Sequence, residues 1–471
     1  MLPEPKNYVA FPSVVLADTP TQITILPTEK AFLLFEGEEY ELTVIDVNED
    51  EINYYHNTNH TTVTAVAHDG ILRLSYTFRG EQEHWIHLKK DGKKLAELCL
   101  FSLYEDLYAL TPLKGDLHAH SFRSDGAQDP SALAGHFREQ GYDFFALTDH
   151  NRYYPGKEID ETYRDIALGI TRIPGEEVHT PGSMVHIVHV GGKESVAARY
   201  IHNGETYESE VATYKASLPD SIPAPLADRY ARAKWATEKI HEADGLAIFA
   251  HPYWRTRSLS YNVYDEFARL LLTSGMFDAF ELIGGAGCVD NNRAIALWGE
   301  LRKEGLDLPV VASSDVHGLK GSKSFPFYHT VCFAAENTPA AIVQAIRAKR
   351  SVAVEVTGTD YAVQNRCYGD LRLVTYAQYL LAHYFPQRQR LCQGAGVAMR
   401  AYAMGDAPKE LIEWQEQVCK KFTEQFFGKK EPTLPTKEIL AFEERWRKTH
   451  LTEGPETKGS QINTGTVTRQ L

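Results

Sequence analysis

Three clusters of histidine and carboxylate residues, each at the end of a predicted β-strand, constrain the fold of this chain most. They occupy residues 116–120 (Asp-Leu-His-Ala-His), 148–151 (Thr-Asp-His-Asn) and 314–317 (Ser-Asp-Val-His). Histidines and carboxylates are ligands of zinc, manganese and iron centres, and strand ends are where several segments of a β/α protein converge. The three clusters therefore predict a fold that gathers these strand ends around a multinuclear metal site.

The segment from Lys114 to about Glu355 alternates between strand-like and helix-like patterns. We expect strands at residues 115–120, 144–150, 171–179, 185–191, 246–251, 279–283, 310–317 and 329–334. We expect helices at residues 130–140, 227–243, 263–274, 292–303 and 339–349. Such alternation indicates parallel strands with helical crossovers, closed as a barrel or open as a doubly wound sheet. Residues 192–226 interrupt it and are a candidate lid.

The segments on either side of this α/β region have different patterns. Residues 1–108 contain short alternating strands separated by turn residues, which predicts a small β-sandwich domain. The central domain then covers residues 109–358. Residues 359–450 predict a helical C-terminal region that packs on the barrel, forms a lid or supplies a surface for a homo-oligomer. Residues 451–471 are polar and are expected to be disordered.

Length and charge limit the classes of function. The chain has 471 residues, enough for two or three domains. It carries 49 Lys and Arg against 63 Asp and Glu, for a net charge of −14. Such a field repels long polyanions, so we expect no long nucleic acid as a partner. A small anionic substrate remains compatible, because bound metal ions invert the local potential.

Cysteine usage and the N-terminus indicate a cytoplasmic protein. The six cysteines are scattered without a C-x-x-C pair, which is typical of reduced thiols. The first residues lack a signal-peptide pattern, and no apolar run approaches the roughly 20 residues of a membrane span. We therefore expect no membrane association. The cysteines are Cys99, Cys288, Cys332, Cys367, Cys392 and Cys419.

Alternation along a strand decides which residues of the clusters share a face. His118 and His120 point to one side of their strand, as Asp315 and His317 do on theirs. Each pair thus supplies two ligands that converge from one face. His150 follows the apolar run that begins at Phe144, and is a further candidate ligand.

Several positions remain open on this reasoning. One of Glu176 and Glu177 faces the barrel interior, and alternation does not say which. His186 and His189 point to opposite faces of their strand, so one of them is a candidate ligand. Asp149 is either a metal ligand or a group that orients a ligating histidine through a hydrogen bond to its ring. His251 follows the apolar run 246–250 and precedes a proline. It is either a metal ligand or a buried histidine that is hydrogen-bonded to the backbone.

No nucleophile motif competes with these clusters. The sequence has no G-x-S-x-G elbow and no G-x-x-x-x-G-K-[ST] loop. Residues 284–287 (Gly-Gly-Ala-Gly) resemble a phosphate loop superficially, and we interpret them as a tight turn from strand to helix.

These motifs, in this order, resemble the PHP (polymerase and histidinol phosphatase) superfamily. The resemblance spans residues 114 to 355, about half of the chain. A β-sandwich before such a domain is similar to the branch that includes carbaryl-hydrolase-like metallohydrolases. The matching segments are residues 116–120, 124–126 (Ser-Asp-Gly), 148–151, 174–177 (Pro-Gly-Glu-Glu), 250–252 (Ala-His-Pro), 280–282 (Phe-Glu-Leu) and 313–317.

The resemblance implies a distorted (β/α)7 barrel with two or three divalent ions (Zn, Mn or Fe) at the C-terminal strand ends. By matching position, His118, His120, Glu177 and Asp315 would hold the first ion. Glu177 would bridge to a second ion, completed by His186 and His251. The third ion would be held by Asp125, His150 and His317. The family's Gly-x-Glu pattern favours Glu177 over Glu176, while the spacing to His186 departs from the commonest family pattern.

The amidohydrolase barrel is the nearest structural competitor, because it also opens with H-x-H on its first strand. That family usually adds a carboxylated lysine on a strand in the middle of the barrel. No lysine ends a predicted strand here, and Asp125 with residues 148–151 favours the PHP interpretation.

Metal chemistry suggests a hydrolytic reaction. Clustered divalent ions lower the pKa of a bridging water and supply hydroxide, and they also polarise a phosphoryl or carbonyl oxygen. We assign catalytic roles to Glu177, which would set the metal spacing, and to Asp315 and His317, which would shuttle the leaving-group proton. The sequence does not decide between these two as the proton carrier.

Arginines near the ligands favour an anionic substrate. Arg152, Arg255 and Arg257 are the candidates, because a guanidinium suits bidentate phosphate contact; solvated surface charge is the alternative for each. The leading hypothesis is a metal-dependent phosphoesterase for a small phosphomonoester or a short nucleotide-type phosphodiester. The alternatives are a carbamate or carboxylic ester hydrolase on the same metals, and a non-catalytic binding module with a vestigial barrel.

Overall fold

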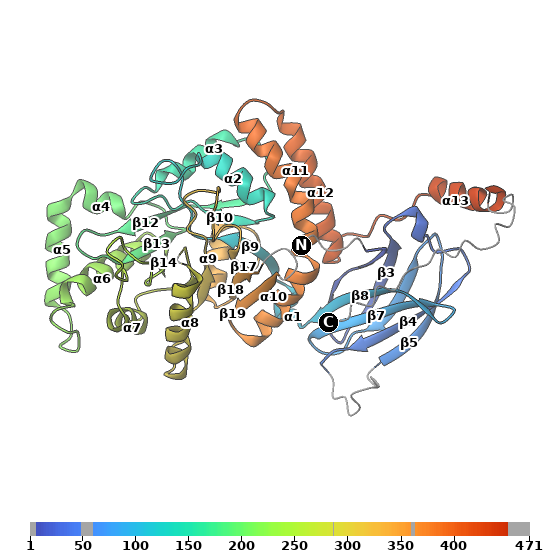
Figure 1. Cartoon of the computed structure of the whole chain (residues 1–471), viewed down its shortest axis with the longest axis horizontal. Coiled ribbons are helices and arrows are strands. Elements are labelled where there is room, and N and C mark those ends of the chain that lie inside the picture. The colour runs from blue at the N-terminus through green and yellow to red at the C-terminus, as the bar shows by residue number, and fades with distance from the viewer. Residues whose placement is uncertain (1–5, 49–59, 286, 359–362, 451–471) are drawn as a thin grey trace. The chain divides into compact units, whose positions relative to one another are not determined.

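A computed structural model describes residues 6–48, 60–285, 287–358 and 363–450 of the chain. These residues form two compact units (Figure 1). One unit is Leu103–Phe426, and the other combines the described parts of Pro5–Ser102 and Phe427–Leu471. The segment 451–471, expected to be disordered, lies outside the described residues.

The first hundred residues form two sheets of short strands. The strand orders are β1-β3-β6 and β2-β8-β7-β4-β5, and the hydrogen-bonded pairs within them run antiparallel. Buried and less buried residues alternate along β7, which places His84, Ile86 and Leu88 on its inner face. Side chains from both sheets join one apolar cluster. The strands are β1 (Tyr8–Phe11), β2 (Val14–Leu16), β3 (Pro20–Pro27), β4 (Glu39–Asp46), β5 (His60–Val66), β6 (Leu72–Thr77), β7 (Gln82–Lys90) and β8 (Lys93–Leu103).

The larger unit is a mixed α/β structure built on two curled sheets. Their orders are β11-β10-β9-β17-β18-β19 and β12-β13-β14-β15-β16. Isolated parallel bridges join the two sheets where His150 meets Glu177 and where Ala119 meets Val316. The strands are β9 (Thr111–Asp116), β10 (Phe144–Ala146), β11 (Thr171–Ile173), β12 (Gly175–His179), β13 (His186–Val190), β14 (Leu246–Phe249), β15 (Ala279–Ile283), β16 (Val310–Ala312), β17 (Tyr328–Ala334), β18 (Ser351–Thr357) and β19 (Gln364–Tyr368).

The prediction of parallel strands is right for part of this unit and wrong for the rest. β9, β10 and β11 pair in parallel, as do β14, β15 and β16. In contrast, β13 is antiparallel to both neighbours, and β17 is antiparallel to β9 and β18. The connection from β12 to β13 is too short for a crossover helix, so these strands can pair only as a hairpin.

The expected strand 171–179 is divided by Pro174 into β11 and β12, which belong to different sheets. Proline has no backbone N–H to donate to a sheet ladder, so a break at this position is consistent with its chemistry. Several other strands end earlier than expected. β10 ends at Ala146 and β16 at Ala312, and the polar residues that follow lie in loops at the strand ends.

The five helices expected in the α/β region are present as α2, α6, α7, α8 and α9, although α8 begins four residues earlier than expected, and α1, α3, α4 and α5 had no expected range. α2 begins with Pro130 after Asp129, whose carboxylate accepts a hydrogen bond from the backbone N–H of Ala132. The helices of this unit are α1 (Glu105–Tyr108), α2 (Pro130–Glu139), α3 (Lys157–Thr162), α4 (Ala197–His202), α5 (Gly204–Ala216), α6 (Ala227–Glu242), α7 (Asp265–Thr273), α8 (Cys288–Lys303), α9 (Pro339–Arg347), α10 (Leu371–His383), α11 (Phe385–Ala403) and α12 (Lys409–Phe426). The segment 192–226 thus contains α4 and α5.

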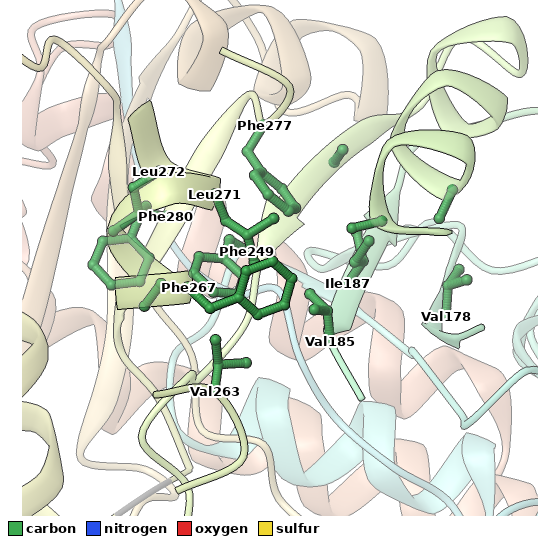
Figure 2. Close-up of a cluster of buried hydrophobic side chains, with 14 of the residues drawn as sticks. Val178, Val185, Ile187, Phe249, Val263, Phe267, Leu271, Leu272, Phe277 and Phe280 are labelled. Carbon is green, nitrogen blue, oxygen red and sulfur yellow. The ribbon is translucent and has the colours of Figure 1, made fainter. Parts of the chain in front are cut away.

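An apolar core lies between the second sheet and the helices that cover its outer face. Figure 2 shows Val178, Ile187, Phe249 and Phe280 of four successive strands beside side chains of α7, all of which belong to one buried cluster. Each buried phenylalanine stabilises the fold by about 1.5–3 kcal/mol. Because side chains alternate along a strand, the neighbours of Val178 on β12 point to the opposite face of the sheet.

The helical C-terminal region is shared between the two units. α10, α11 and α12 belong to the larger unit, where α11 packs against α2 and α12 (Figure 1). α13 (Lys437–His450) belongs to the smaller unit. The five cysteines whose side chains the structure describes form no disulfide.

Candidate metal centre

The strands β12 and β13, which carry Glu177 and His186, and the loops after other strands of the larger unit bring all nine predicted metal ligands into one cluster. They surround the carboxylate of Glu177, which is fully buried. These residues fall into three groups, one for each predicted ion. The sets of ligand atoms that all lie within 4.8 Å of one another agree with these groups only in part. Among the described residues of this cluster, these sets are His118, Glu177, His251 and Asp315; His120, Asp125, His150 and His317; and His150, Glu177 and His179. The predicted ligands are His118, His120, Asp125, His150, Glu177, His186, His251, Asp315 and His317.

The first group has the spacing of a tetrahedral site. His118 Nε2 lies 3.3 Å from both Glu177 Oε2 and Asp315 Oδ1. His120 Nε2 lies 3.4 Å from Glu177 Oε2 and 2.9 Å from Asp315 Oδ1. Ligands bound about 2.0–2.1 Å from one tetrahedral ion are separated by about 3.3 Å, so these four atoms fit one ion. They are the four residues that the resemblance assigned to the first ion.

The second group surrounds the other oxygen of Glu177. Oε1 lies 3.0 Å from His186 Nδ1 and 3.2 Å from His251 Nε2. It also lies 3.2 Å from Nε2 of His179, which was not among the predicted ligands. The two oxygens of Glu177 therefore face different sets of imidazoles, which is the arrangement of a carboxylate that bridges two ions.

The third group lies on the more exposed side of the cluster. Asp125 Oδ2 lies 3.3 Å from His150 Nε2, and Asp125 Oδ1 lies 3.4 Å from His317 Nε2. His120 also belongs to this group, at 4.0 Å between its Nδ1 and Asp125 Oδ1. Asp125 has a half-exposed side chain, so this group is the most open of the three to solvent.

Buried atoms without hydrogen bonds show that these residues fit metal ions. Such atoms are costly in a folded protein unless a partner satisfies them. Several of them point into this cluster, and a cation would satisfy them together. They are His118 Nε2, His150 Nδ1, His179 Nε2, His186 Nδ1 and Glu177 Oε2.

The charges of the cluster hold its carboxylates ionised. Burial alone would raise the pKa of Glu177, but the imidazoles of His118, His186 and His179 outweigh it and hold that pKa well below its usual range. Burial lowers the pKa of His186 to about 4, which keeps its ring neutral, as a metal ligand must be. Burial also acts to lower the pKa of His251, but Glu177 and Asp315 raise it to about 9.

Glu281 orients His118 from behind. Its Oε2 lies 2.9 Å from His118 Nδ1, so that nitrogen is placed to donate a proton and Nε2 is left to face the cluster. The following turn allows this approach, because a Cβ atom at Gly284 would lie 2.2 Å from Glu281 Oε1. A Cβ at Gly285 would likewise meet Asp315 at 2.4 Å. Gly284 and Gly285 directly follow β15, and the expected turn 284–287 includes residue 286, which lies outside the described residues.

The structure shows which of Glu176 and Glu177, and which of His186 and His189, faces the cluster. Glu176 and His189 lie on the far face of their strands and contact each other, with 3.3 Å between Oε1 and Nδ1. Glu176 also accepts hydrogen bonds from Ser195 Oγ and the backbone N–H of Val196. Asp149 accepts hydrogen bonds from the backbone N–H and Oγ of Ser121, and belongs to none of the three groups. These residues support the cluster from outside.

The three predicted substrate arginines are all exposed, and they differ in their surroundings. Arg152 lines a pocket of about 400 Å³ together with Arg123 and the exposed ring of Tyr154. Arg255 Nε lies 3.1 Å from Asp290 Oδ1, so its charge is partly matched within the protein. Arg257 lies in the same loop as Arg255. The structure therefore makes Arg152 the best placed of the three beside a cavity.

Sequence reasoning missed two residues of the site. His179 is two positions after Glu177 on one strand, so the alternation rule already placed both on the same face. Glu281 lay within a segment that carried the family resemblance, but it was given no role. Both signals were present in the sequence and were obscured by the stronger H-x-H motifs.

Comparison with known proteins gives partial similarities. No family model matches the chain. The 5'-3' exoribonuclease of Haemophilus influenzae is 27% identical over 258 residues, which cover 43% of this chain and 90% of that protein. No described helix is long and apolar enough to cross a membrane.

Two solved structures are similar to parts of the chain. One is a two-domain protein from Bacteroides vulgatus described as containing a "predicted PHP-like metal-dependent phosphoesterase", with 19% identity, a TM-score of 0.35, and coverage of 55% of this chain and 76% of that one. The other is an amidohydrolase from Chromobacterium violaceum, with 20% identity, a TM-score of 0.31, and coverage of 45% and 89%. Both similarities cover only part of this chain, and the carbaryl-hydrolase branch stays a prediction.

Proposed function

We propose that this protein is a PHP-type, metal-dependent phosphoesterase whose site is the cluster around Glu177. The observation that carries the proposal is the bridging position of this carboxylate, with one oxygen facing His118 and His120 and the other facing His186 and His251. A structural ion needs one closed set of ligands, whereas adjoining sets that share a carboxylate are typical of hydrolytic centres.

The protein's own residues would hold and orient the reacting groups. Divalent ions bound in the cluster would supply a nucleophile derived from water near neutral pH and would neutralise charge on the substrate. Glu177 would keep the ion positions at a constant separation. Asp315 or His317 would carry a proton to the leaving group; His317 would do so with the third ion absent, because its Nε2 beside Asp125 would otherwise bind that ion.

The cavity that Asn151 lines supports a class of substrate. Asn151, which follows His150 directly, lines the same pocket as Arg152 and Tyr154, and Arg123 in this pocket is paired with Glu158. The guanidinium of Arg152 and an exposed aromatic ring suit a phosphate joined to a flat organic group. We therefore propose a small phosphomonoester or a short nucleotide-type phosphodiester as the substrate, and the similarity to the 5'-3' exoribonuclease of Haemophilus influenzae supports this class.

Metal content measured by mass spectrometry on desalted protein tests the proposal when it is combined with hydrolysis assays. We expect two or three ions per chain, with turnover of p-nitrophenyl phosphate or bis-p-nitrophenyl phosphate. The variants His118→Ala and Asp315→Ala should lose bound metal and should also lose turnover. The control His241→Ala, which removes an imidazole on α6 that pairs with Asp278, should retain both.

Other results would contradict the proposal. Bound ions with turnover of an aryl carbamate alone would assign the centre to a carbamate or carboxylic ester hydrolase. Neither bound ions nor turnover after reconstitution with manganese or zinc would leave a binding module with a vestigial barrel.

A further inference from the structure

We propose that His179 is a metal ligand in addition to those assigned by the motifs, so that the second ion is held by three imidazoles and Glu177. The inference rests on the proposed metal centre and concerns the composition of one of its sites. Zinc and iron accept imidazole-rich sites, while manganese favours oxygen ligands. One more imidazole therefore shifts this position towards zinc or iron.

The strand pairing places His179 at the second ion. Glu177 and His179 are two residues apart on β12 and lie on the same face of the sheet. β12 and β13 pair antiparallel with His179 directly opposite His186. Their rings stack, with centroids 3.7 Å apart and planes inclined by 25°. The hairpin thus presents two parallel imidazoles to one carboxylate oxygen.

Distances and burial support ligation by His179. Its Nε2 lies 3.2 Å from Glu177 Oε1, the same distance that separates this oxygen from His251 Nε2. That spacing matches the roughly 3.3 Å between two ligands of one tetrahedral ion. The Nε2 atom is buried and makes no hydrogen bond, although the side chain as a whole is 29% exposed. The ring therefore points its ligating atom inward and its opposite edge outward.

A network of hydrogen bonds holds the backbone of His179 in place. The backbone N–H of His179 donates to Asn151 Oδ1 over 2.8 Å, and the backbone N–H of Asn151 donates to the carbonyl of Glu177 over 2.9 Å. Asn151 has a positive φ of 55°, a conformation that asparagine tolerates better than most residues. Tyr200 of α4 donates its hydroxyl to the same Oδ1 atom over 2.5 Å. Such supporting contacts around a ligand are typical of metal sites.

Zinc titration of the metal-free, full-length protein tests the assignment. We expect His179→Ala and the larger His179→Gln to lose roughly tenfold or more in affinity for one ion, with the other ions unaffected. His241→Ala is the matched control, because it removes an exposed imidazole from the same unit. Circular dichroism spectra of all variants report whether each remains folded.

Anomalous diffraction from zinc-loaded crystals of the unaltered chain is an independent test that needs no variant. An ion about 2.0–2.1 Å from His179 Nε2 would support the assignment. Zinc in the unaltered protein with no ion near that atom, or with unchanged zinc affinity in both variants, would overturn this inference and leave the proposed function intact. A wild-type protein that binds no metal would instead overturn both.

Discussion

At the scale of single residues, the centre depends on groups that hold the ligands as much as on the ligands themselves. Glu281 sets the orientation of His118, and Asn151 holds the strand end that carries His179. The positive φ of Asp315, 50°, is a conformation that costs energy for a residue other than glycine. It is maintained where the loop after β16 turns a carboxylate back towards His118 and His120.

Replacing Glu281 with glutamine tests this supporting role. The amide keeps the shape of the side chain but removes the charge that favours a proton on His118 Nδ1. We expect metal affinity to fall roughly 10- to 100-fold, as is common when a group behind a metal ligand is changed. Titration calorimetry measures it, with the exposed Glu304→Gln as control. Equal metal affinity in the Glu281→Gln and Glu304→Gln variants would contradict the supporting role of Glu281.

Lys114 provides a second prediction at this scale, through the pH dependence of stability. Burial lowers the pKa of Lys114 to about 8 from its ordinary value of 10.5. Between these two values the folded amine is neutral while the unfolded amine still carries a proton, so unfolding takes up protons and the stability contributed by this group rises with pH. Below about pH 8 the amine is charged in both states and its burial is destabilising.

The comparison with Lys114→Met isolates this effect. We expect the free energy of unfolding of the wild type, relative to the variant, to increase by up to the order of 3 kcal/mol between about pH 8 and pH 10.5. Urea unfolding at several pH values measures the difference. A difference that stays constant over this range would contradict the buried, low-pKa amine.

At the scale of secondary-structure elements, buried ion pairs attach the C-terminal helices to the α/β unit. Arg138 of α2 and Glu416 of α12 are both buried, with 2.8 Å between Nε and Oε1. Arg388 of α11 pairs with Asp143 in the same way. α11 and α12 are therefore held to the unit by specific charges as well as by apolar contacts.

The variant Glu416→Ala tests this attachment. It leaves the guanidinium of Arg138 buried without its charged partner, which typically costs about 3–5 kcal/mol. The exposed pair of Arg269 on α7 and Glu304, the residue after α8, is the matched control, with 2.8 Å between Nη1 and Oε1, and Glu304→Ala should cost less than about 1 kcal/mol. Thermal or urea unfolding compares the two variants. Equal losses of stability would show that burial does not distinguish these pairs.

At the scale of the whole molecule, the net charge of −14 predicts that long anionic substrates are repelled from the protein. A short phosphoester carries few charges and meets little repulsion on approach. The many phosphates of a long nucleic acid are repelled by the net negative charge of the protein, and salt screens this repulsion. We therefore expect the substrate to be short as well as anionic.

Salt dependence tests this limit. Raising the salt concentration from about 10 mM to about 150 mM shortens the Debye length from about 30 Å to about 8 Å. We expect kcat/KM for a long oligonucleotide to rise relative to that for a dinucleotide over this range. Steady-state kinetics with both substrates measures the ratio. A ratio that falls with salt would indicate a basic binding track for long nucleic acids.

The sequence by itself determined the ligand chemistry and most of the helices and strands. The H-x-H and D-x-H patterns identified candidate ligands. Their expected position within strands was wrong, because β9 ends at Asp116 and β16 at Ala312, and both pairs lie in the loops that follow. The ranges of α2, α6, α9 and β15 follow from local capping and periodicity, and agree with the expected ranges within two residues at each end. For the same reason, the sequence placed all nine candidate ligands near the strand ends.

Only the tertiary structure decided which face of each strand is the inner one. Glu176 and Glu177 are equivalent by alternation, and the choice depends on the apolar core that Val178 joins on the outer face of the second sheet. The antiparallel pairing of β12 and β13 brings His179 opposite His186 through contacts between strands, which no local pattern specifies. Local periodicity therefore determined which residues could be ligands, and long-range packing determined which of them meet.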